Sequence, residues 1–344
     1  MASSLPREVK NVLVCGGAGY IGSHTVLELT RQSDSTVYIL DNLSTGYEKT
    51  IPKSDRVVFI NGDVSDVDFV DREVFSKYKI DAVMHFCALI VVPESVTNPL
   101  KYYDNNVVGT LRLLQVMQKH EVPYFIFSST AAVFGIPETS PIDPSAATVP
   151  INPYGETKLV VERMLRWCSE AYGLKFASLR YFNACGADKE INIGECHKPE
   201  SHLIPIILQV ALGQRENVQV FGDDYNTVDG TCVRDYIHVT DLATAHIRAL
   251  EYLAKGGKSD VFNLGSGLGY TVKEVVDACR KVTGHPIPAV VSPRRGGDPD
   301  SLVAGSKKAE EVLGWTRKYD SIEKIVETAW RWHKNNPHGF DHAH

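Results

Sequence analysis

The sequence predicts an α/β protein with a Rossmann-type, doubly wound parallel sheet and a smaller mixed α/β domain that binds a substrate. From residue 10 to about 185, strand-like apolar runs alternate with helical patterns, which is typical of a parallel sheet with helices on both faces. The first run, Val12–Val14, breaks into a glycine-rich turn that restarts as a helix. The alternation then fails, so we expect a first domain at 1–185 and a second at 186–344, with segments near 233–265 returning to the first.

The composition is that of an ordinary globular protein. The 344 residues are 43% hydrophobic and 23% charged, and the formal net charge is −6. The basic residues are scattered, which disfavours a nucleic-acid or anionic-membrane partner. Seven cysteines without paired spacing favour a reducing compartment. No apolar run approaches the roughly 18–20 residues of a membrane span, so we expect a cytoplasmic protein.

Three glycines follow the first strand with the spacing G-x-x-G-x-x-G. A strand that ends in such a turn and restarts as a helix can hold a pyrophosphate, because free backbone N–H groups and the positive helix end face the anion. We assign Gly16 to the tight turn, Gly19 to the close approach of backbone and phosphate, and Gly22 to the packing of helix on strand. Taken alone, the glycines also fit a structural turn without a ligand.

An acidic residue follows the second predicted strand, Thr36–Leu40. Asp41 comes about twenty residues after the glycines, where a dinucleotide-binding fold carries its ribose-binding acid. A carboxylate there accepts hydrogen bonds from the adenosine 2′ and 3′ hydroxyls and repels a 2′-phosphate, which predicts NAD as the cofactor and not NADP. A turn cap is the alternative role for Asp41. The third strand, Arg56–Ile60, leads to Asp63, which fits either an adenine contact or an ordinary turn.

A tyrosine and a lysine form the predicted catalytic pair. Tyr154 and Lys158 are four residues apart on a predicted helix and therefore project from one face. A free tyrosine loses its proton near about pH 10, but a nearby cation and a positive nicotinamide ring favour the phenolate. The fifth strand, Tyr124–Phe127, runs into hydroxyl-bearing residues that end at Thr130, a candidate third hydroxyl. A solvated helix face is the alternative for an isolated Y-x-x-x-K pattern.

Arginines in the second half of the chain are candidates for a second phosphate site. Arg234 and the pair Arg294-Arg295 carry planar guanidinium groups, which hold diphosphates at two points. Surface salt bridges are the alternative. A domain with its own phosphate ligands suggests a nucleotide-sugar substrate. No metal site is predicted, because the histidines between His338 and His344 have no carboxylate or cysteine framework.

Several motifs together make the chain resemble the UDP-glucose 4-epimerase family of the extended short-chain dehydrogenase/reductases. They are Cys15–His24, Asp41-Asn42, Tyr154–Lys158, Leu179–Asn183 and Asp229–Val239. The resemblance runs from residue 10 to 340. It implies that NAD stays bound through the catalytic cycle and that the protein is a homodimer.

The resemblance also implies a reaction, the interconversion of UDP-glucose and UDP-galactose. Tyr154 would take the proton of the sugar 4-hydroxyl while NAD⁺ takes the C4 hydride. Thr130 would shuttle the proton or polarise the oxygen, and Lys158 would hold the phenolate. The 4-keto sugar would then turn over, anchored by its UDP, and receive the hydride on its other face.

Together with the motifs, the resemblance implies two sets of binding residues. The expected cofactor residues are Gly16, Gly19, Tyr20, Ile21, Gly22, Asp41, Asn42, Ser44, Thr45, Asp63, Val64, Phe86, Ala88, Asn105, Ser128, Tyr154, Lys158 and Tyr181. The expected substrate residues are Thr130, Tyr154, Asn183, His202, Leu203, Gln219, Phe221, Arg234, Arg295, Asp298 and Leu302.

Three positions depart from the pattern of many family members. Thr130 stands in place of serine, and either residue can donate a hydrogen bond. Ile90 stands where many relatives carry a lysine near the cofactor. Leu302 occupies a position that is tyrosine in some epimerases confined to glucose and galactose, and smaller in some that accept N-acetylated sugars. Activity on UDP-GlcNAc and UDP-GalNAc is therefore a hypothesis.

Two other functions fit parts of the sequence. A sugar-nucleotide 4,6-dehydratase or decarboxylase begins with the same oxidation, but dehydratases of this superfamily place an Asp-Glu pair after the threonine, where this chain has Ala131-Ala132. An NAD-binding sensor would keep the fold and is expected to lose Tyr154 or Lys158, both of which are present.

Overall fold

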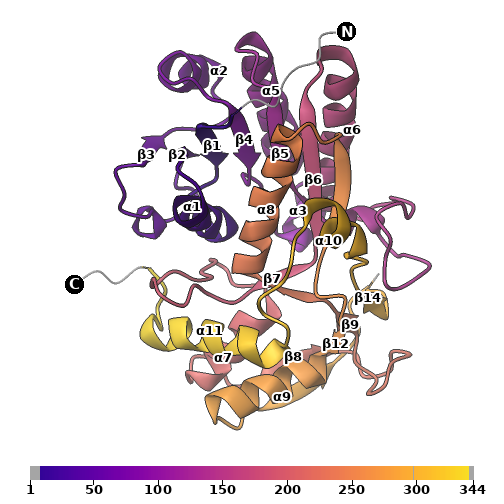
Figure 1. Ribbon diagram of the computed structural model, residues 1–344. Helices are drawn as coiled ribbons and strands as arrows, with labels where there is room; N and C mark the ends of the chain where they lie inside the picture. The colour runs from indigo at the N-terminus through magenta and orange to yellow at the C-terminus, as the bar shows by residue number, and fades with distance from the viewer. Residues whose placement is uncertain (1–7, 297, 341–344) are drawn as a thin grey trace.

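The computed structural model describes residues 8–296 and 298–340. Its centre is a seven-stranded parallel sheet with the order β3-β2-β1-β4-β5-β6-β11 (Figure 1). The strands are β1 (Asn11–Cys15), β2 (Thr36–Asp41), β3 (Val57–Asn61), β4 (Ala82–His85), β5 (Tyr124–Thr130), β6 (Lys175–Tyr181) and β11 (Asp260–Leu264). The order reverses between β1 and β4, and a doubly wound sheet binds its ligand at the carboxyl ends of the strands there. The predicted fold class is confirmed.

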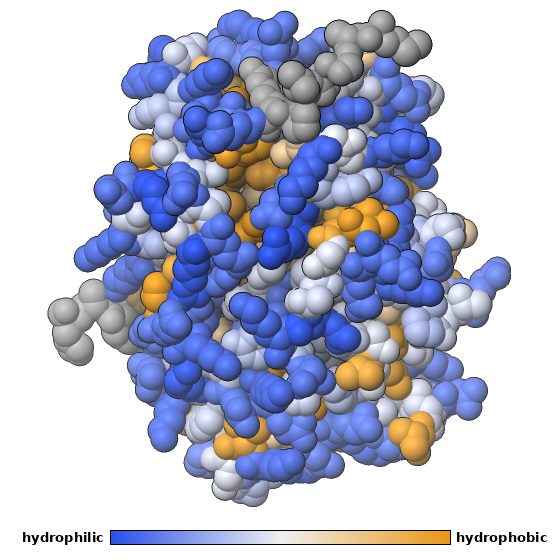
Figure 2. Space-filling model, in the orientation of Figure 1, coloured by the Kyte–Doolittle hydropathy of each residue, from blue (hydrophilic) through white to orange (hydrophobic). Residues whose placement is uncertain are grey.

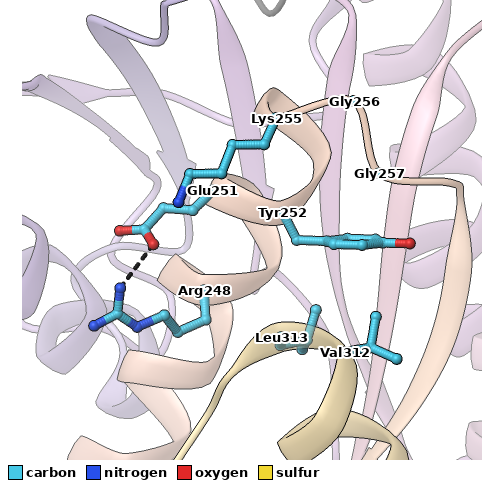
Figure 3. Close-up of a pocket in the computed structure, with 8 residues that line it drawn as sticks. All are labelled: Arg248, Glu251, Tyr252, Lys255, Gly256, Gly257, Val312 and Leu313. Atoms are coloured by element: carbon cyan, nitrogen blue, oxygen red, sulfur yellow. Dashed lines mark hydrogen bonds and ion pairs between the residues drawn. The ribbon is translucent and has the colours of Figure 1, made fainter.

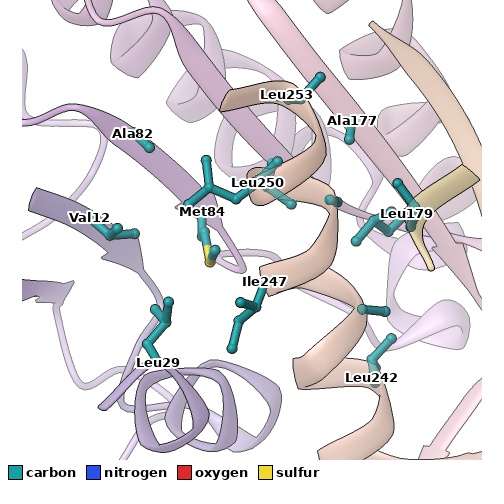
Figure 4. Packing of buried hydrophobic residues seen from close by; sticks show 14 of the residues in the cluster. Val12, Leu29, Ala82, Met84, Ala177, Leu179, Leu242, Ile247, Leu250 and Leu253 are labelled. Atoms are coloured by element: carbon teal, nitrogen blue, oxygen red, sulfur yellow. The ribbon is translucent and has the colours of Figure 1, made fainter. Parts of the chain in front are cut away.

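Apolar side chains cover both faces of the sheet, because successive strand residues point to opposite faces. Val12 and Val14 of β1 pack in the cluster that includes α1 and α8, whereas Leu13 and Cys15 pack in the cluster that includes α5 and α6. Figure 4 shows the first of these clusters between the sheet and α8. Each large aliphatic side chain buried there contributes about 1.5–3 kcal/mol. The four helices are α1 (Tyr20–Gln32), α5 (Gly109–Lys119), α6 (Pro153–Tyr172) and α8 (Val239–Ala254).

Short helical segments connect the strands of this sheet. They are a 3₁₀ turn at Glu48–Thr50, α2 (Val67–Phe69) with a π-helical turn at Val70–Phe75, α3 (Val92–Thr97), α4 (Pro99–Tyr102), a π-helical turn at Tyr103–Val108 and a 3₁₀ turn at Ala131–Phe134. The π-helical turn at Tyr103–Val108 runs directly into α5. Such turns are rare and often mark functional sites.

Smaller sheets and a second helical core form the lower part of the molecule in Figure 1. Three helices share this core: α7 (Leu203–Ala211), α9 (Val272–Thr283) and α11 (Ile322–Asn335). The strand pairs are β7 (Asn183–Cys185) with β10 (Tyr236–His238), β9 (Val233–Arg234) with β12 (Tyr270–Thr271) and β14 (Ser301–Leu302), and β8 (Val218–Phe221) with β13 (Ala289–Ser292). α10 (Lys307–Leu313) packs on α8.

The segments near 233–265 divide between the two parts. β11 joins the central sheet beside β6, whereas β9 and β10 pair with the smaller sheets. Asp235 lies between β9 and β10. Its buried carboxylate accepts hydrogen bonds from the backbone N–H groups of Ser266, Gly267 and Ala304, which separates the two strands. Only the later part of this range therefore lies in the central sheet. The division of the chain into two domains at residue 185 stays a prediction.

The surface seen in Figure 2 is mainly hydrophilic, with small, separated apolar patches. Within residues 8–296 and 298–340, none of the helices combines the length and the apolar composition that crossing a membrane requires.

A buried ion pair fixes α6 to the central sheet. Arg180 of β6 places Nη2 2.6 Å from Oε2 of Glu162 on α6, and its Nε donates to Glu162 Oε1 at 2.9 Å. The hydroxyl of Ser129 on β5 donates to the same Oε1 at 2.6 Å. The two charged side chains are only 7% and 5% exposed. Buried charges cost free energy unless they are paired and hydrogen-bonded, so this network specifies where α6 meets the ends of β5 and β6.

Glu162→Ala should lower the free energy of unfolding by about 3–5 kcal/mol, because it leaves the Arg180 guanidinium buried without a counter-ion. Urea unfolding followed by circular dichroism measures the change. Glu156→Ala on the same helix is the control, since Glu156 lies 3.7 Å from a half-exposed Arg163 and should cost less than about 1 kcal/mol. Equal losses in the two variants would mean that the buried pair does not hold the helix.

Candidate active site

The glycine turn after β1 brings β1, β4 and α1 into backbone contact. Gly16 has φ of +78°, in the left-handed region that favours glycine, and a Cβ on it would lie 2.9 Å from the backbone nitrogen of Cys87. A Cβ on Gly22 would lie 2.1 Å from the carbonyl oxygen of Gly16, so α1 packs on the turn only with glycine at this position. A Cβ on Gly19 would meet only that same oxygen, at 3.3 Å. The Gly19 side of the turn is therefore open.

The start of α1 suits an anion. Gly19 precedes the helix without a side-chain cap, and the first turn, which begins with Tyr20 and Ile21, contains no acidic residue. The first N–H groups of a helix have no partner within the helix, and the helix dipole favours negative charge there. The residues present therefore fit the pyrophosphate of a dinucleotide.

Asp41 at the end of β2 is buried and supports the glycine turn. Its Oδ2 accepts from the backbone N–H of Ala18 at 2.9 Å, and its Oδ1 accepts from that of Leu43 at 2.8 Å. Burial raises the pKa of Asp41, and these two hydrogen bonds oppose that rise. Each carboxylate oxygen can accept more than one hydrogen bond. The two roles that the sequence left open, turn cap and ribose ligand, are thus compatible.

Residues that follow β2 and β3 meet beside Asp41. The Asn42 side chain donates to Asp63 Oδ2 at 2.8 Å and accepts from the backbone N–H of Ser44 at 3.0 Å. Burial alone would raise the pKa of Asp63, but hydrogen bonds from Ser65 and Asn42 lower it. Thr45 is exposed beside Ser44. Two separate segments predicted to bind the cofactor therefore form one surface.

Asn106 is a positioning residue that the sequence analysis missed. It is 2% exposed, accepts from Leu89 N at 2.9 Å and donates to Leu89 O and to the Thr157 hydroxyl, each at 3.1 Å. These bonds tie the loop after β4, which carries Phe86 and Ala88, to α6. Its neighbour Asn105, a predicted cofactor residue, donates to it at 2.9 Å. The signal in the sequence was the asparagine pair within a helical apolar pattern.

Tyr154 and Thr130 meet where α6 begins and β5 ends. Asn152 caps α6 by accepting from Gly155 N at 2.9 Å, and Pro153 occupies its first turn. Burial raises the pKa of Tyr154 well above its ordinary value, and Tyr181 adds to the rise, while a hydrogen bond with the Thr130 side chain opposes it. Without a further positive charge the phenol stays protonated at neutral pH. The base therefore depends on a bound cation such as an oxidised nicotinamide ring.

Lys158 lies one turn further along α6 and is 3% exposed. Its ammonium donates to the carbonyl oxygen of Ser128 at 2.9 Å and lies 4.9 Å from the centre of the Phe127 ring. Burial lowers the pKa of Lys158 to about 8. The hydroxyl of Ser128 in turn donates to Tyr181 at 3.0 Å. The lysine thus shares a helix face with Tyr154, as its spacing predicts, but its hydrogen bond goes to the strand end and not to the phenol.

Arginines of the smaller sheets lie near the other predicted substrate residues. Arg234 Nη2 is 2.9 Å from Asp298 Oδ1, and the Arg295 guanidinium lies 4.0 Å from the centre of the Phe221 ring. Arg294 instead contacts Asp224 at 2.5 Å. Arg234 and Arg294 each form an ion pair, and that of Arg294 is the more exposed of the two, as expected for the surface salt bridge that was the alternative to phosphate binding.

The remaining predicted substrate residues occupy three places. Asn183 begins β7 and donates to the Asp235 carbonyl at 2.8 Å. Leu302 packs against the apolar cluster that contains Ala131, the residue after Thr130. His202 and Leu203 lie at the start of α7, and Gln219 is exposed on β8. Ile90 is 39% exposed in the loop after β4.

The predicted cofactor residues all lie at the carboxyl ends of β1 to β6 or in segments that follow those ends. Val64, for example, comes just after β3, and Tyr181 ends β6. A surface hollow of about 370 Å³ lies elsewhere, between the end of α8 and α10 (Figure 3). It is lined by Arg248, Glu251, Tyr252, Lys255, Gly256, Gly257, Val312 and Leu313. Because α8 leads into the start of β11, the hollow is near the opposite end of the sheet.

The fold and these contacts define an enzyme of the dinucleotide-dependent class, with a buried tyrosine at the carboxyl end of the sheet. Residues 12–265 match the model of the NAD dependent epimerase/dehydratase family. The chain belongs to this family.

Relatives with high similarity cover nearly the whole chain. It is 57% identical to the UDP-glucose 4-epimerase of Halalkalibacterium halodurans over 96% of this chain and 97% of that protein. The crystal structure of UDP-glucose 4-epimerase from Bifidobacterium longum in complex with NAD⁺ and UDP is 42% identical, with a TM-score of 0.89, over 96% of this chain and 100% of that one. The structure of the UDP-Glc/GlcNAc 4-epimerase of Campylobacter jejuni is also 42% identical, with a TM-score of 0.84, over 95% of this chain and 99% of that one.

Two single substitutions, Gly22→Ala and Gly19→Ala, should distinguish the glycine needed for packing from the glycine needed for ligand binding. Gly22→Ala forces a Cβ into the Gly16 carbonyl and should lower the free energy of unfolding by about 1–3 kcal/mol. Gly19→Ala should change stability by less than about 1 kcal/mol but weaken NAD binding by about tenfold or more, because the methyl group enters the open side of the turn. Chemical denaturation measures the first effect, and calorimetric titration of NAD into protein stripped of its resident cofactor measures the second. Wild-type NAD affinity in Gly19→Ala would contradict the assigned cradle.

Proposed function

We propose that the protein is a UDP-glucose 4-epimerase that interconverts UDP-glucose and UDP-galactose. The observation that carries this proposal is the meeting of Tyr154 and Thr130 at the carboxyl end of β5, with Lys158 on the same helix face. The relatives named above support the substrate class. Residues 186–344 would supply most of the contacts to the UDP-sugar, and residues 1–185 those to NAD.

The chain's own residues account for the proton. When bound, NAD supplies the oxidant for the hydrogen on sugar C4 and its positive ring favours the Tyr154 phenolate. Tyr154 takes the proton of the 4-hydroxyl onto its phenolic oxygen, and the Thr130 hydroxyl orients that oxygen by its hydrogen bond. Burial of Tyr154, Thr130 and Lys158, which are 8%, 9% and 3% exposed, excludes water from the transfer.

Epimerisation needs the sugar to present its other face to the same tyrosine. Arg234 and Arg295 are proposed to hold the diphosphate, and Asn183 the nucleotide end, so that only the sugar turns. Tyr154 then returns the proton to the same oxygen at the opposite configuration of C4. Tyr154 exchanges the proton, and the hydride is exchanged with the bound cofactor, in both halves of the cycle. The sugar is therefore neither oxidised nor reduced overall.

A dehydratase or decarboxylase is the second candidate, since the first oxidation is shared. Loss of water from the sugar requires an acid beside Thr130. The segment that follows Thr130 is the apolar turn Ala131–Phe134, which offers no proton donor from its side chains. This segment favours the epimerase.

We further infer a cytoplasmic homodimer. Support for self-association comes from α3 to α5, which expose the apolar side chains of Val96, Leu100 and Leu111 at 59%, 79% and 42%. Sedimentation of the purified chain tests the dimer, and a monomer at micromolar concentration would refute it.

Tyr154→Phe should lower turnover by about 10²–10⁴-fold, because it removes the proton acceptor and leaves the ring in place. NAD content should stay at the wild-type level, measured by release on denaturation. Tyr172→Phe is the control, since Tyr172 ends the same helix and is 62% exposed. Near-normal turnover of Tyr154→Phe would refute the assignment of Tyr154 as the base.

Assays with UDP-galactose and with UDP-GalNAc determine which sugars the enzyme epimerises. Purified enzyme without added NAD should convert UDP-galactose to UDP-glucose. If Leu302 leaves room for an N-acetyl group, the enzyme also converts UDP-GalNAc, and Leu302→Tyr should lose this second activity and keep the first. Chromatography of the products measures both. Failure to epimerise UDP-GlcNAc at high enzyme concentration would end the extension to N-acetylated sugars.

A further inference from the structure

Four side chains converge in the loop between β7 and α7, which takes no part in the proposed proton transfer, although one of them, His202, is also a predicted substrate residue. They are Glu195, His197, Glu200 and His202, and one nitrogen or oxygen atom from each lies within 4.8 Å of all the others. His202 Nδ1 is 2.7 Å from Glu195 Oε1, and His197 Nδ1 is 3.3 Å from that same oxygen. Glu200 approaches His202 Nδ1 to 3.5 Å and His197 Nδ1 to 3.8 Å. The spacing E-x-H-x-x-E-x-H places all four donors within one short loop.

Three of these atoms are buried and have no hydrogen-bond partner: Glu195 Oε1, His197 Nδ1 and His202 Nδ1. The carboxylates of Glu195 and Glu200 are only 3% and 4% exposed. Buried polar atoms nearly always have a partner. The two nitrogens and the oxygen instead gather in one place with the Glu200 carboxylate, all four ligand atoms lying within 4.8 Å of one another. A cation at that point satisfies all three atoms at once.

We infer that this loop binds one divalent transition-metal ion, with Zn²⁺ as the best match. Two imidazole nitrogens and two carboxylate oxygens suit Zn²⁺, whereas Mg²⁺ and Ca²⁺ prefer oxygen ligands alone. Four protein ligands leave no position for a substrate, which is the pattern of a structural site.

The position of the loop indicates what the ion does. The His197 ring lies 6.1 Å from the ring of Tyr20, the first residue of α1 after the glycine turn. The Tyr20 hydroxyl donates to the Gly186 carbonyl at 2.7 Å. His202 directly precedes α7, which begins at Leu203. The ion therefore fixes a loop that connects the start of α1 to the start of α7. This role does not rest on the proposed reaction.

Two buried His–Glu ion pairs are the competing explanation. Burial lowers the pKa of His202, but Glu195 and Glu200 raise it to about 10, and the same two carboxylates raise that of His197 to about 9. Protonated rings would balance the two carboxylates without a metal. The two explanations differ in metal content, which makes them separable by experiment.

The test uses the full chain, purified without a histidine tag, stripped with EDTA and then titrated with Zn²⁺ or Co²⁺. We expect about one ion per chain by elemental analysis, intense visible absorption of the Co²⁺ form as in tetrahedral sites, and a higher Tm with Zn²⁺. His197→Ala and the isosteric Glu195→Gln should lose the ion and the Tm increase. His120→Ala should keep both, since His120 pairs with Asp71 at 2.5 Å and is not one of the four clustered residues.

Substitution of His338, His342 and His344 together controls for binding to the C-terminal histidines and should leave the stoichiometry unchanged. A wild-type protein that takes up no Zn²⁺ at micromolar concentration would overturn the inference in favour of the ion pairs. Equal metal content in wild type and in Glu195→Gln would also overturn it, because the ion would then lie elsewhere. Folded wild-type protein suffices for the Co²⁺ spectrum, so a variant that fails to fold does not remove the test.

Discussion

The buried ion pair between Arg180 and Glu162 is the constraint on which the active site depends. It joins β6 to α6, and the Ser129 hydroxyl adds β5 to the same carboxylate. Ser129 is next to Thr130, and Glu162 is one helical turn beyond Lys158. The network thus ties together the strand that carries Thr130 and the helix that carries Tyr154. A charged pair in this place gives α6 one position along the sheet, which apolar packing alone specifies less strictly.

Burial of the site sets its chemistry as well as its geometry. It raises the pKa of Tyr154 and lowers that of Lys158 to about 8. Both pKa shifts disfavour the charged form of the side chain. Without a ligand, Tyr154 is therefore a neutral phenol that cannot accept a proton. In the proposed mechanism a bound positive ring shifts this balance, so that the Tyr154 phenolate forms only where the oxidant is present. The open glycine turn and the Asp41 carboxylate are the proposed contacts that hold this ligand at the carboxyl ends of the same strands.

Local patterns predicted the sheet and the ligand-binding turn, because strand periodicity and glycine spacing report on neighbouring residues. The strand at Val12–Val14 is confirmed, whereas the binding and catalytic roles of Asp41, Tyr154 and Lys158 stay predictions. Contacts between distant segments were not predictable: Asn106 bonds to the loop after β4, and Asp235 turns the chain by binding three backbone N–H groups. The substrate contact of His202 stays a prediction, and its ion pair with Glu195 joins two residues that no pattern in the sequence had linked.

The central claim is that one buried tyrosine and a resident oxidant remove and restore hydrogen at a single carbon. Isotope transfer measures this most directly. Incubation of the enzyme with UDP-galactose carrying deuterium at sugar C4, in ordinary water, should give UDP-glucose that keeps the deuterium at C4, as read by mass spectrometry. Loss of the label to water, or its appearance on unlabelled UDP-sugar added as a trap, would contradict the account.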